Sequence, residues 1–297
     1  MNKKTDACCP PEQDKQPNDK YDLTVIGAGS AGFSAAITAA DQGAQVALVG
    51  YGTIGGTCVN VGCVPSKTLI RATEAVHHSQ VASRFTGITA NAQLSDWNAL
   101  RRQKDELVSS LRQAKYIDLL PAYNNIAYLE GKAKLESDGV SVDGQHIQAD
   151  KVIIATGSHE FLPNIPGIEA VDSLTSTSAF EMENLPTSLI VVGGGYIGCE
   201  LAQMFSRAGV EVTIVFRSRL IPEGEPEISA ALSGYFTKEN IAVRQIDSYV
   251  KVHERDGKVT LAVNVKDRLD GISAEKILFA AGRKPNTVGL GLEDVGV

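Results

Sequence analysis

At 297 residues the chain is long enough for about two ordinary domains, each with its own hydrophobic core. Its formal net charge of -7 argues against nucleic acid as a partner, because proteins that bind nucleic acid present a basic face. No apolar run is long enough to span a bilayer and the N-terminus lacks an apolar signal core, so we expect a cytoplasmic protein without a membrane partner.

Residues 1–20 are polar, contain prolines and show no hydrophobic period, which predicts a disordered tail. The tail carries Cys8 and Cys9, whose adjacent thiols could capture a soft metal ion, although such a pair in a tail is more often incidental. The chain has 5 cysteines, an odd number. This count fits a reducing compartment, in which a disulfide is more often catalytic than structural.

The first ordered segment reads as a Rossmann unit. A short buried strand at 22–26 leads into Gly27, Gly29 and Gly32, and a helix is expected over 33–42. In this context the first glycine permits the turn, the second lets the backbone approach a pyrophosphate, and the third lets the helix pack on the strand. The segment therefore predicts a dinucleotide site.

The second strand of this unit, at 45–49, lacks one expected feature. An acidic residue commonly ends that strand and binds the ribose hydroxyls, but Gly50 stands at the position. The sequence does not show which group takes over the ribose contact.

Two cysteines separated by four residues follow. Cys58 and Cys63 lie between a diglycine and Pro65, and a helix is expected from Ser66 to about Ala82. A helix N-terminus lowers a thiol pKa, as does an ammonium such as that of Lys67, so the spacing favours a redox pair.

Two other interpretations of the pair remain, a zinc site and a buried structural pair. Zinc usually takes four ligands, and the other cysteines, Cys8, Cys9 and Cys199, form no matching half-site. The buried structural pair stays open at this point.

The next segments predict a helix that covers the sheet, and then short strands joined by Asp-Gly turns. A tight turn at Thr156–Gly157 could approach a bound cofactor. The helix is expected over 94–120 and the strands over 126–135, 140–142, 146–148 and 151–154.

A second Rossmann unit follows a segment rich in proline and glycine at 158–168. Its strand at 189–192 leads into Gly193, Gly195 and Gly198, and then come a helix over 199–208 and a strand over 210–215. Two such units imply two dinucleotides, which an enzyme needs mainly when electrons pass from one to the other.

The second unit also lacks the ribose-binding acid, and Arg217 and Arg219 stand near that position. Arginines suit a 2'-phosphate, which favours NADPH over NADH, unless both side chains are simply solvated. In the helix, Cys199 is expected to be a small buried hydrophobic residue. Glu200 needs a positive partner beside a bound phosphate, and Lys67 is a candidate.

The rest of the chain continues the α/β pattern, so the fold class is α/β with two Rossmann-like domains. The expected elements are a helix over 227–240 and strands over 241–246, 249–254, 259–265 and 276–280.

Two Rossmann units with a CxxxxC pair in the first resemble the flavoprotein disulfide reductases, whose fold is that of glutathione reductase. The resemblance covers 21–297 and is most specific in GGTCVNVGCVPSK at 55–67. Among these enzymes, 52–54, 68–72 and 111–116 look most like mercuric reductases.

The resemblance implies FAD in a domain over 21–160, NADPH in a domain over 161–282, and the start of a return to the FAD domain over 283–297. For FAD the implied residues are Gly27, Gly29, Gly32, Gly52, Thr57, Lys67, Ala133, Thr156 and Gly157. For NADPH they are Gly193, Gly195, Gly198, Arg217 and Arg219.

The resemblance also implies catalytic roles. Cys63 would be the thiolate against the flavin and Cys58 the outer, exchanging thiol, while Lys67 and Glu200 would pair near flavin N5. Tyr196 would cover the flavin until nicotinamide displaces it. In mercuric reductases the two thiolates bind Hg(II), which is reduced to Hg(0) in mercury detoxification.

The family's second FAD-binding stretch and its C-terminal dimerisation domain have no counterpart before Val297. We therefore expect an N-terminal fragment of a homodimer that binds FAD poorly and is inactive alone. The alternatives are dihydrolipoamide dehydrogenase or another flavoprotein disulfide reductase and, in a different class, a non-catalytic thiol metal binder.

Overall fold

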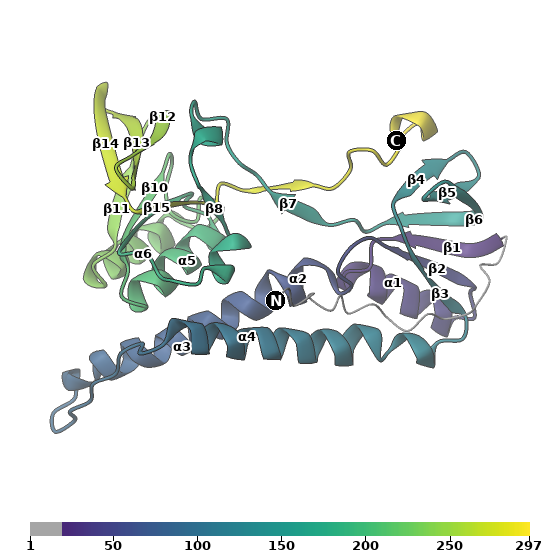
Figure 1. Ribbon diagram of the computed structural model, residues 1–297, viewed down its shortest axis with the longest axis horizontal. Coiled ribbons are helices and arrows are strands. Elements are labelled where there is room, and N and C mark those ends of the chain that lie inside the picture. Colours follow the sequence, from purple (N-terminus) through teal and green to yellow (C-terminus); the bar gives the residue numbers. More distant parts are fainter. Residues whose placement is uncertain (1–19) are drawn as a thin grey trace, which may run out of the picture. The chain divides into compact units, whose positions relative to one another are not determined.

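The computed structural model describes residues 20–297 (Figure 1). The predicted tail and its pair Cys8 and Cys9 lie outside the described residues, except that Lys20 already belongs to the first strand. Contacts divide the chain into two compact units, and each is considered by itself. Unit 1 comprises the chain up to Cys63, Glu106–Ser158 and Pro285–Val297, and unit 2 comprises Val64–Asp105 and His159–Lys284.

Unit 1 is built on a six-stranded sheet in the order β3-β2-β1-β6-β5-β4, in which β1, β2, β3 and β6 run parallel. Helix α1 contacts this parallel part of the sheet (Figure 1). The strands are β1 (Lys20–Ile26), β2 (Val46–Gly50), β3 (Ile126–Glu130), β4 (Ala133–Glu136), β5 (Gly139–Val142) and β6 (Gln145–Ile154), and the helices are α1 (Ser30–Asp41) and α2 (Gly56–Asn60).

The prediction of two strands over 146–148 and 151–154 is wrong, because β6 is one continuous strand. Its first half pairs with β5 and its second half with β1, and Gln148 is bonded on both sides. Two different partners therefore hold a single strand straight through Ala149 and Asp150. The Asp143-Gly144 turn is present, with φ values of 47° and 88°, as a two-residue hairpin turn requires.

Unit 2 has a five-stranded parallel sheet in the order β11-β10-β9-β15-β8. Side chains of β9 alternate between two cores: Leu189 and Val191 join a core with helices α5 and α6, while Ile190 and Val192 face a small antiparallel sheet. The parallel elements are β8 (Leu174–Thr175), β9 (Ser188–Val192), α5 (Tyr196–Arg207), β10 (Glu211–Phe216), α6 (Pro226–Lys238), β11 (Ala242–Gln245) and β15 (Lys276–Phe279).

The antiparallel sheet of unit 2 consists of β12 (Ser248–Arg255), β13 (Lys258–Val265) and β14 (Arg268–Ala274). The sequence did not predict β14. The strand reads Arg-Leu-Asp-Gly-Ile-Ser-Ala, has few β-branched residues and buries only Ile272 and Ala274. Its pairing with β13 forms it despite this weak local preference. A further pair, β7 (Ser158–Glu160) with β16 (Arg283–Pro285), lies where the chain passes between the units.

Helices α3 (Cys63–Gln80) and α4 (Trp97–Arg112) differ from their predicted bounds. Helix α3 begins at Cys63 and not at Ser66, because Pro65 is tolerated in a first turn whose N–H groups have no helical partner. Helix α4 begins at Trp97, where Asp96 accepts a hydrogen bond from the Ala99 N–H at 3.0 Å.

Helix α4 also ends earlier than the predicted Leu120. A wider π-helical turn follows over Gln113–Ile117, and a 3-10 turn at Leu120–Ala122 contains a proline. Within residues 20–297, none of the helices combines the length and the apolar character needed to cross a membrane.

Candidate functional site

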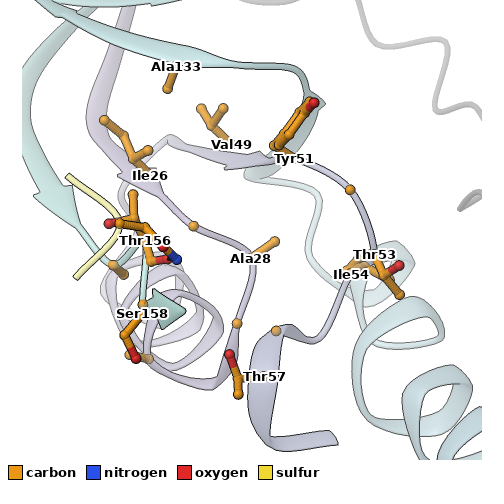
Figure 2. A pocket seen from close by; sticks show the side chains of 18 of the residues that line it. Ile26, Ala28, Val49, Tyr51, Thr53, Ile54, Thr57, Ala133, Thr156 and Ser158 are labelled. Atoms are coloured by element: carbon orange, nitrogen blue, oxygen red, sulfur yellow. Dashed lines mark hydrogen bonds between the residues drawn. The ribbon is translucent and has the colours of Figure 1, made fainter. Parts of the chain in front are cut away.

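A cavity of about 770 Å³ opens in unit 1 beyond the carboxyl ends of β1, β2 and β6. This is the place where open parallel sheets bind nucleotides, and the volume lies within the roughly 300–1,000 Å³ of small-molecule pockets. Figure 2 shows Ile26 and Val49 at the strand ends, Thr57 from α2, and Ala133 and Thr156 from later segments around it.

The glycine turn between β1 and α1 forms one wall of the cavity. Gly27 has φ 121°, and a Cβ there would overlap the Ala155 carbonyl, while a Cβ at Gly32 would overlap the Gly27 carbonyl oxygen. These two glycines therefore allow close packing of the backbone. Gly29 lines the cavity and, like Gly27, presents bare backbone there, so the wall fits a pyrophosphate.

The diglycine of the cysteine motif is attached to this turn. The Gly55 N–H donates to the Ala28 carbonyl at 2.8 Å, and Gly29 and Gly55 form an isolated parallel bridge. Gly56 has φ 68°, and a Cβ there would come to 2.6 Å from the Gly29 Cα. Both positions of the diglycine thus require glycine, and their contact brings the following cysteine to the cavity.

Asn60 fixes the segment between the cysteines. Its side-chain amide donates to the carbonyls of Ile54 and Gly56 at 2.9 Å, and its oxygen accepts from Arg112 Nη1 at 3.0 Å. All three bonds are made within unit 1. The short helix α2 is therefore held at both ends, although its sequence alone would not form a stable helix.

Cys58 is half-buried and lines the cavity, and Cys63 is exposed at the start of α3. Both cysteines are free thiols in this structure. A hydrogen bond with the Cys63 side chain raises the pKa of Cys58, and burial adds to the rise, while the Lys115 ammonium acts in the opposite direction. The bond to Cys63 therefore favours the neutral form of the Cys58 thiol.

Cys199 is the third described cysteine and is only 6% exposed, as expected for a small buried residue. Its thiol donates to the Gly194 carbonyl at 3.5 Å, and burial raises its pKa to about 11. At pH 8 only about a thousandth of this thiol is ionised.

We therefore expect an alkylating reagent at pH 8 to modify Cys63 in seconds to minutes and to leave Cys199 unmodified until the protein is denatured. Peptide mapping by mass spectrometry after timed labelling with iodoacetamide checks this. Labelling of Cys199 at the rate of Cys63 in the native protein would contradict its burial.

The predicted partner of Glu200 is present. Lys67 Nζ donates to Glu200 Oε2 at 2.6 Å, between α3 and α5 within unit 2. The side chains are 54% and 39% exposed, so the pair adds at most about 1 kcal/mol to stability.

The second glycine turn, between β9 and α5, repeats the design of the first. Gly193 has φ 126° beside the Ala280 carbonyl, and a Cβ at Gly198 would overlap the Gly193 carbonyl oxygen. A Cβ at Gly195 would meet no described atom within 4 Å, so this glycine faces open space. Tyr196, the first residue of α5, is 58% exposed.

The two predicted arginines have different surroundings. Arg219 donates from Nη2 to the carbonyls of Pro222 at 2.8 Å and Gly224 at 2.6 Å, which ties down the loop after β10. The guanidinium carbon of Arg217 lies 5.9 Å from the centre of the Tyr249 ring. Arg217 is therefore the better placed of the two to receive a phosphate.

Seven of the nine residues predicted for FAD line the cavity, and Gly32 and Lys67 do not. Those in the lining are Gly27, Gly29, Gly52, Thr57, Ala133, Thr156 and Gly157.

Sequence reasoning missed a further group of lining residues. Asn286 closes one side, since its side chain donates to the Thr156 carbonyl at 2.8 Å. In the sequence, only its position directly after Gly282, Arg283 and Pro285 draws attention to it. Among the others are Ser30, Tyr51, Tyr128 and Lys132.

The sequence profile of the pyridine nucleotide-disulphide oxidoreductase family matches residues 21–297. Among curated proteins, the mercuric reductase of Staphylococcus aureus is 43% identical over 299 residues, covering 97% of this chain and 54% of that protein. The mercuric reductase of Streptomyces lividans is 44% identical over 292 residues, covering 95% and 60%. The chain spans about half the length of the curated relatives it matches.

Among solved structures, the Cu(II) complex of the HOCl-induced flavoprotein disulfide reductase RclA from Escherichia coli is similar to this chain. The TM-score is 0.78 at 28% sequence identity, over 94% of this chain and 60% of that one. A second structure of this reductase from Escherichia coli gives a TM-score of 0.79 at 28% sequence identity. The comparison supports a glutathione-reductase-like fold for the described residues.

Proposed function

The chain belongs to the pyridine nucleotide-disulphide oxidoreductase family. We propose that it forms part of an NADPH-dependent flavoprotein that reduces Hg(II) to Hg(0) through Cys58 and Cys63. One observation carries the proposal: Cys58 lines the dinucleotide cavity while its thiol is hydrogen-bonded to the exposed Cys63. Similarity to mercuric reductases over nearly the whole chain supports Hg(II) as the substrate.

In this proposal the residues of the cavity wall hold FAD, and the second glycine turn holds NADPH. When bound, the two cofactors supply a path for two electrons from nicotinamide to the ion on the sulfurs. Gly29 and Gly195 leave room for the two pyrophosphates, each at a helix N-terminus that favours negative charge. The proposed protein is a homodimer, as the resemblance implies. We place it in the cytoplasm because NADPH and reducing conditions are found there.

The thiol pair binds the metal. Sulfur is a soft ligand suited to a soft ion, and two thiols lie close enough to share a hydrogen bond. Both cysteines are free thiols, so Hg(II) displaces a proton from each sulfur and metal binding releases two protons to solvent. Hg(II) then gains two electrons and leaves as Hg(0), NADPH becomes NADP⁺ with release of a proton, and both sulfurs end as thiolates.

The test uses the full-length protein with FAD bound. We expect NADPH oxidation that depends on Hg(II) in the presence of excess thiol, with one Hg(0) released per NADPH consumed. Absorbance at 340 nm and mercury volatilisation measure the two quantities. Efficient oxidation of dihydrolipoamide with NAD⁺, and no turnover with Hg(II), would identify a dihydrolipoamide dehydrogenase instead.

From the resemblance to flavoprotein disulfide reductases we propose that the Lys67–Glu200 pair influences the charge of a bound flavin, although neither residue lines the cavity of unit 1. Replacing Glu200 with glutamine should lower the rate of flavin reduction by roughly tenfold and shift the flavin absorption band, because the ammonium loses its fixed partner. The free energy of unfolding should change by less than about 1 kcal/mol. Stopped-flow spectra and denaturant titration measure these effects, and a loss of stability with an unchanged spectrum would show a structural role only.

Arg217 is proposed to bind the 2'-phosphate of NADPH. Arg217→Ala should raise the Kd for NADPH by roughly tenfold and leave that for NADH unchanged, since only NADPH carries the phosphate. Arg219→Ala is the comparison variant: it should instead loosen the loop and weaken both nucleotides alike. Fluorescence titration with each nucleotide measures the constants, and an equal loss of both in Arg217→Ala would refute the assignment.

A further inference from the structure

The end of β2 is closed by an aromatic ring where an acidic side chain is commonly found. Gly50 is buried, and a Cβ there would come to 2.8 Å from Tyr128 Cε2 and 2.9 Å from the Ala28 Cβ, with the Tyr128 hydroxyl closer still. The glycine therefore does more than lack a carboxylate. No side chain can stand at this position while Tyr128 holds its place.

Tyr128 reaches this place from the neighbouring strand. It lies on β3, where its backbone pairs with Leu48 of β2, two residues before Gly50. The half-buried ring passes over the glycine, so its hydroxyl lies near the position that a longer residue 50 would occupy. Tyr128 also lines the cavity, so part of its side chain is at the wall against which a ligand would pack.

The rest of the lining offers no substitute carboxylate. Among the described residues that line the cavity none is acidic, and the only charged one is Lys132, whose Nζ lies 5.1 Å from the centre of the Tyr51 ring. An ammonium can only donate a hydrogen bond, whereas a phenol both donates and accepts. Ribose hydroxyls bound at the end of β2 need an acceptor, and the phenol can supply one.

We propose that the Tyr128 hydroxyl replaces the missing carboxylate and hydrogen-bonds the adenosine ribose of the dinucleotide in unit 1. The assignment rests on the proposed function in one respect, which is that this dinucleotide is FAD. It changes the nature of the contact from charged to neutral. A neutral contact is weaker, so the adenosine half depends more on the pyrophosphate wall at Gly27 and Gly29.

One acidic residue provides a competing explanation and a matched control. Glu130 follows Tyr128 by two positions on β3 and pairs with Gly50, so its side chain leaves the strand on the same face. It is exposed and is absent from the cavity lining. We expect no contact between Glu130 and the ribose.

The experiment compares FAD with an analogue that carries 2',3'-dideoxyadenosine and so lacks both ribose hydroxyls. Equilibrium dialysis of the full-length protein, freed of FAD, gives both dissociation constants. Tyr128→Phe should weaken FAD by about three- to tenfold, the loss of one neutral hydrogen bond, and change the Kd of the analogue by less than about twofold. Glu130→Gln should leave both constants unchanged.

Three results would overturn the inference. Equal weakening of FAD and the analogue by Tyr128→Phe would show only a packing role for the ring. A loss in Glu130→Gln that is confined to FAD would assign the ribose to the carboxylate. FAD affinity that is indifferent to Tyr128→Phe would remove the contact altogether. Each of these results leaves the proposed function standing, whereas an unsubstituted protein that binds no FAD would overturn the proposed function as well.

Discussion

Replacing Cys63 with serine should reduce mercury-dependent NADPH oxidation by roughly a thousandfold or more while FAD stays bound. A serine hydroxyl is a hard, neutral ligand at neutral pH and does not hold Hg(II) as a thiolate does. Cys63 is the exposed member of the pair, and its side chain is hydrogen-bonded to Cys58. Steady-state assays at 340 nm with saturating Hg(II) measure the loss, and the flavin spectrum confirms that the cofactor is retained.

Substitutions at Cys58 and Cys199 distinguish the pair from thiols in general. Cys58→Ser should be as inactive as Cys63→Ser, because the ion needs both sulfurs. Cys199→Ala should keep nearly full activity, since this thiol is buried against the Gly194 carbonyl and its pKa is about 11. Full activity of Cys63→Ser, or an inactive but folded Cys199→Ala, would contradict the assignment of the chemistry to Cys58 and Cys63.

The repeated strand–glycine–helix patterns predict both parallel sheets because several of their requirements are local. Gly27 and Gly193 adopt positive φ at the ends of their strands, and Gly32 and Gly198 stand where a Cβ would strike the preceding turn. Such constraints act over about six residues and are therefore legible in the sequence. The predicted boundaries between the domains stay a prediction, although contacts do separate two units.

Features that depend on distant partners were not predictable from local pattern. Strand β14 forms because β13 pairs with it, and β6 is continuous because β5 and β1 bond different halves of it. The compositions of β14 and β6 alone give no sign of these pairings.

The candidate site shows this limit most clearly. The sequence revealed the missing acid at Gly50, but the residue that fills its place, Tyr128, lies 78 positions later on an adjacent strand. The contact of Gly56 with Gly29 likewise joins the cysteine motif to the first glycine turn. The sequence shows only that one motif follows the other along the chain. Spatial convergence, and not residue type, was the missing information.

Alanine at Gly195 and at Gly198 should damage the nucleotide site of unit 2 in opposite ways. A Cβ at Gly198 would overlap the Gly193 carbonyl oxygen, so helix α5 must move away from β9. We expect Gly198→Ala to lower the free energy of unfolding by about 1–3 kcal/mol, the usual cost of overpacking. A Cβ at Gly195 would meet no described atom within 4 Å, and its φ of -76° suits alanine, so stability should change by less than about 1 kcal/mol.

The affinity for NADPH should fall most in Gly195→Ala, the variant whose stability changes least. The methyl group of Gly195→Ala occupies the space through which a pyrophosphate approaches the N-terminus of α5, so the Kd for NADPH should rise by roughly tenfold or more. Denaturant titration and fluorescence titration on the same two variants measure both quantities. Unchanged NADPH affinity in a stable Gly195→Ala would mean that nucleotide does not lie on this turn. A stable Gly198→Ala would mean that α5 and β9 tolerate more separation than their packing at Gly193 indicates.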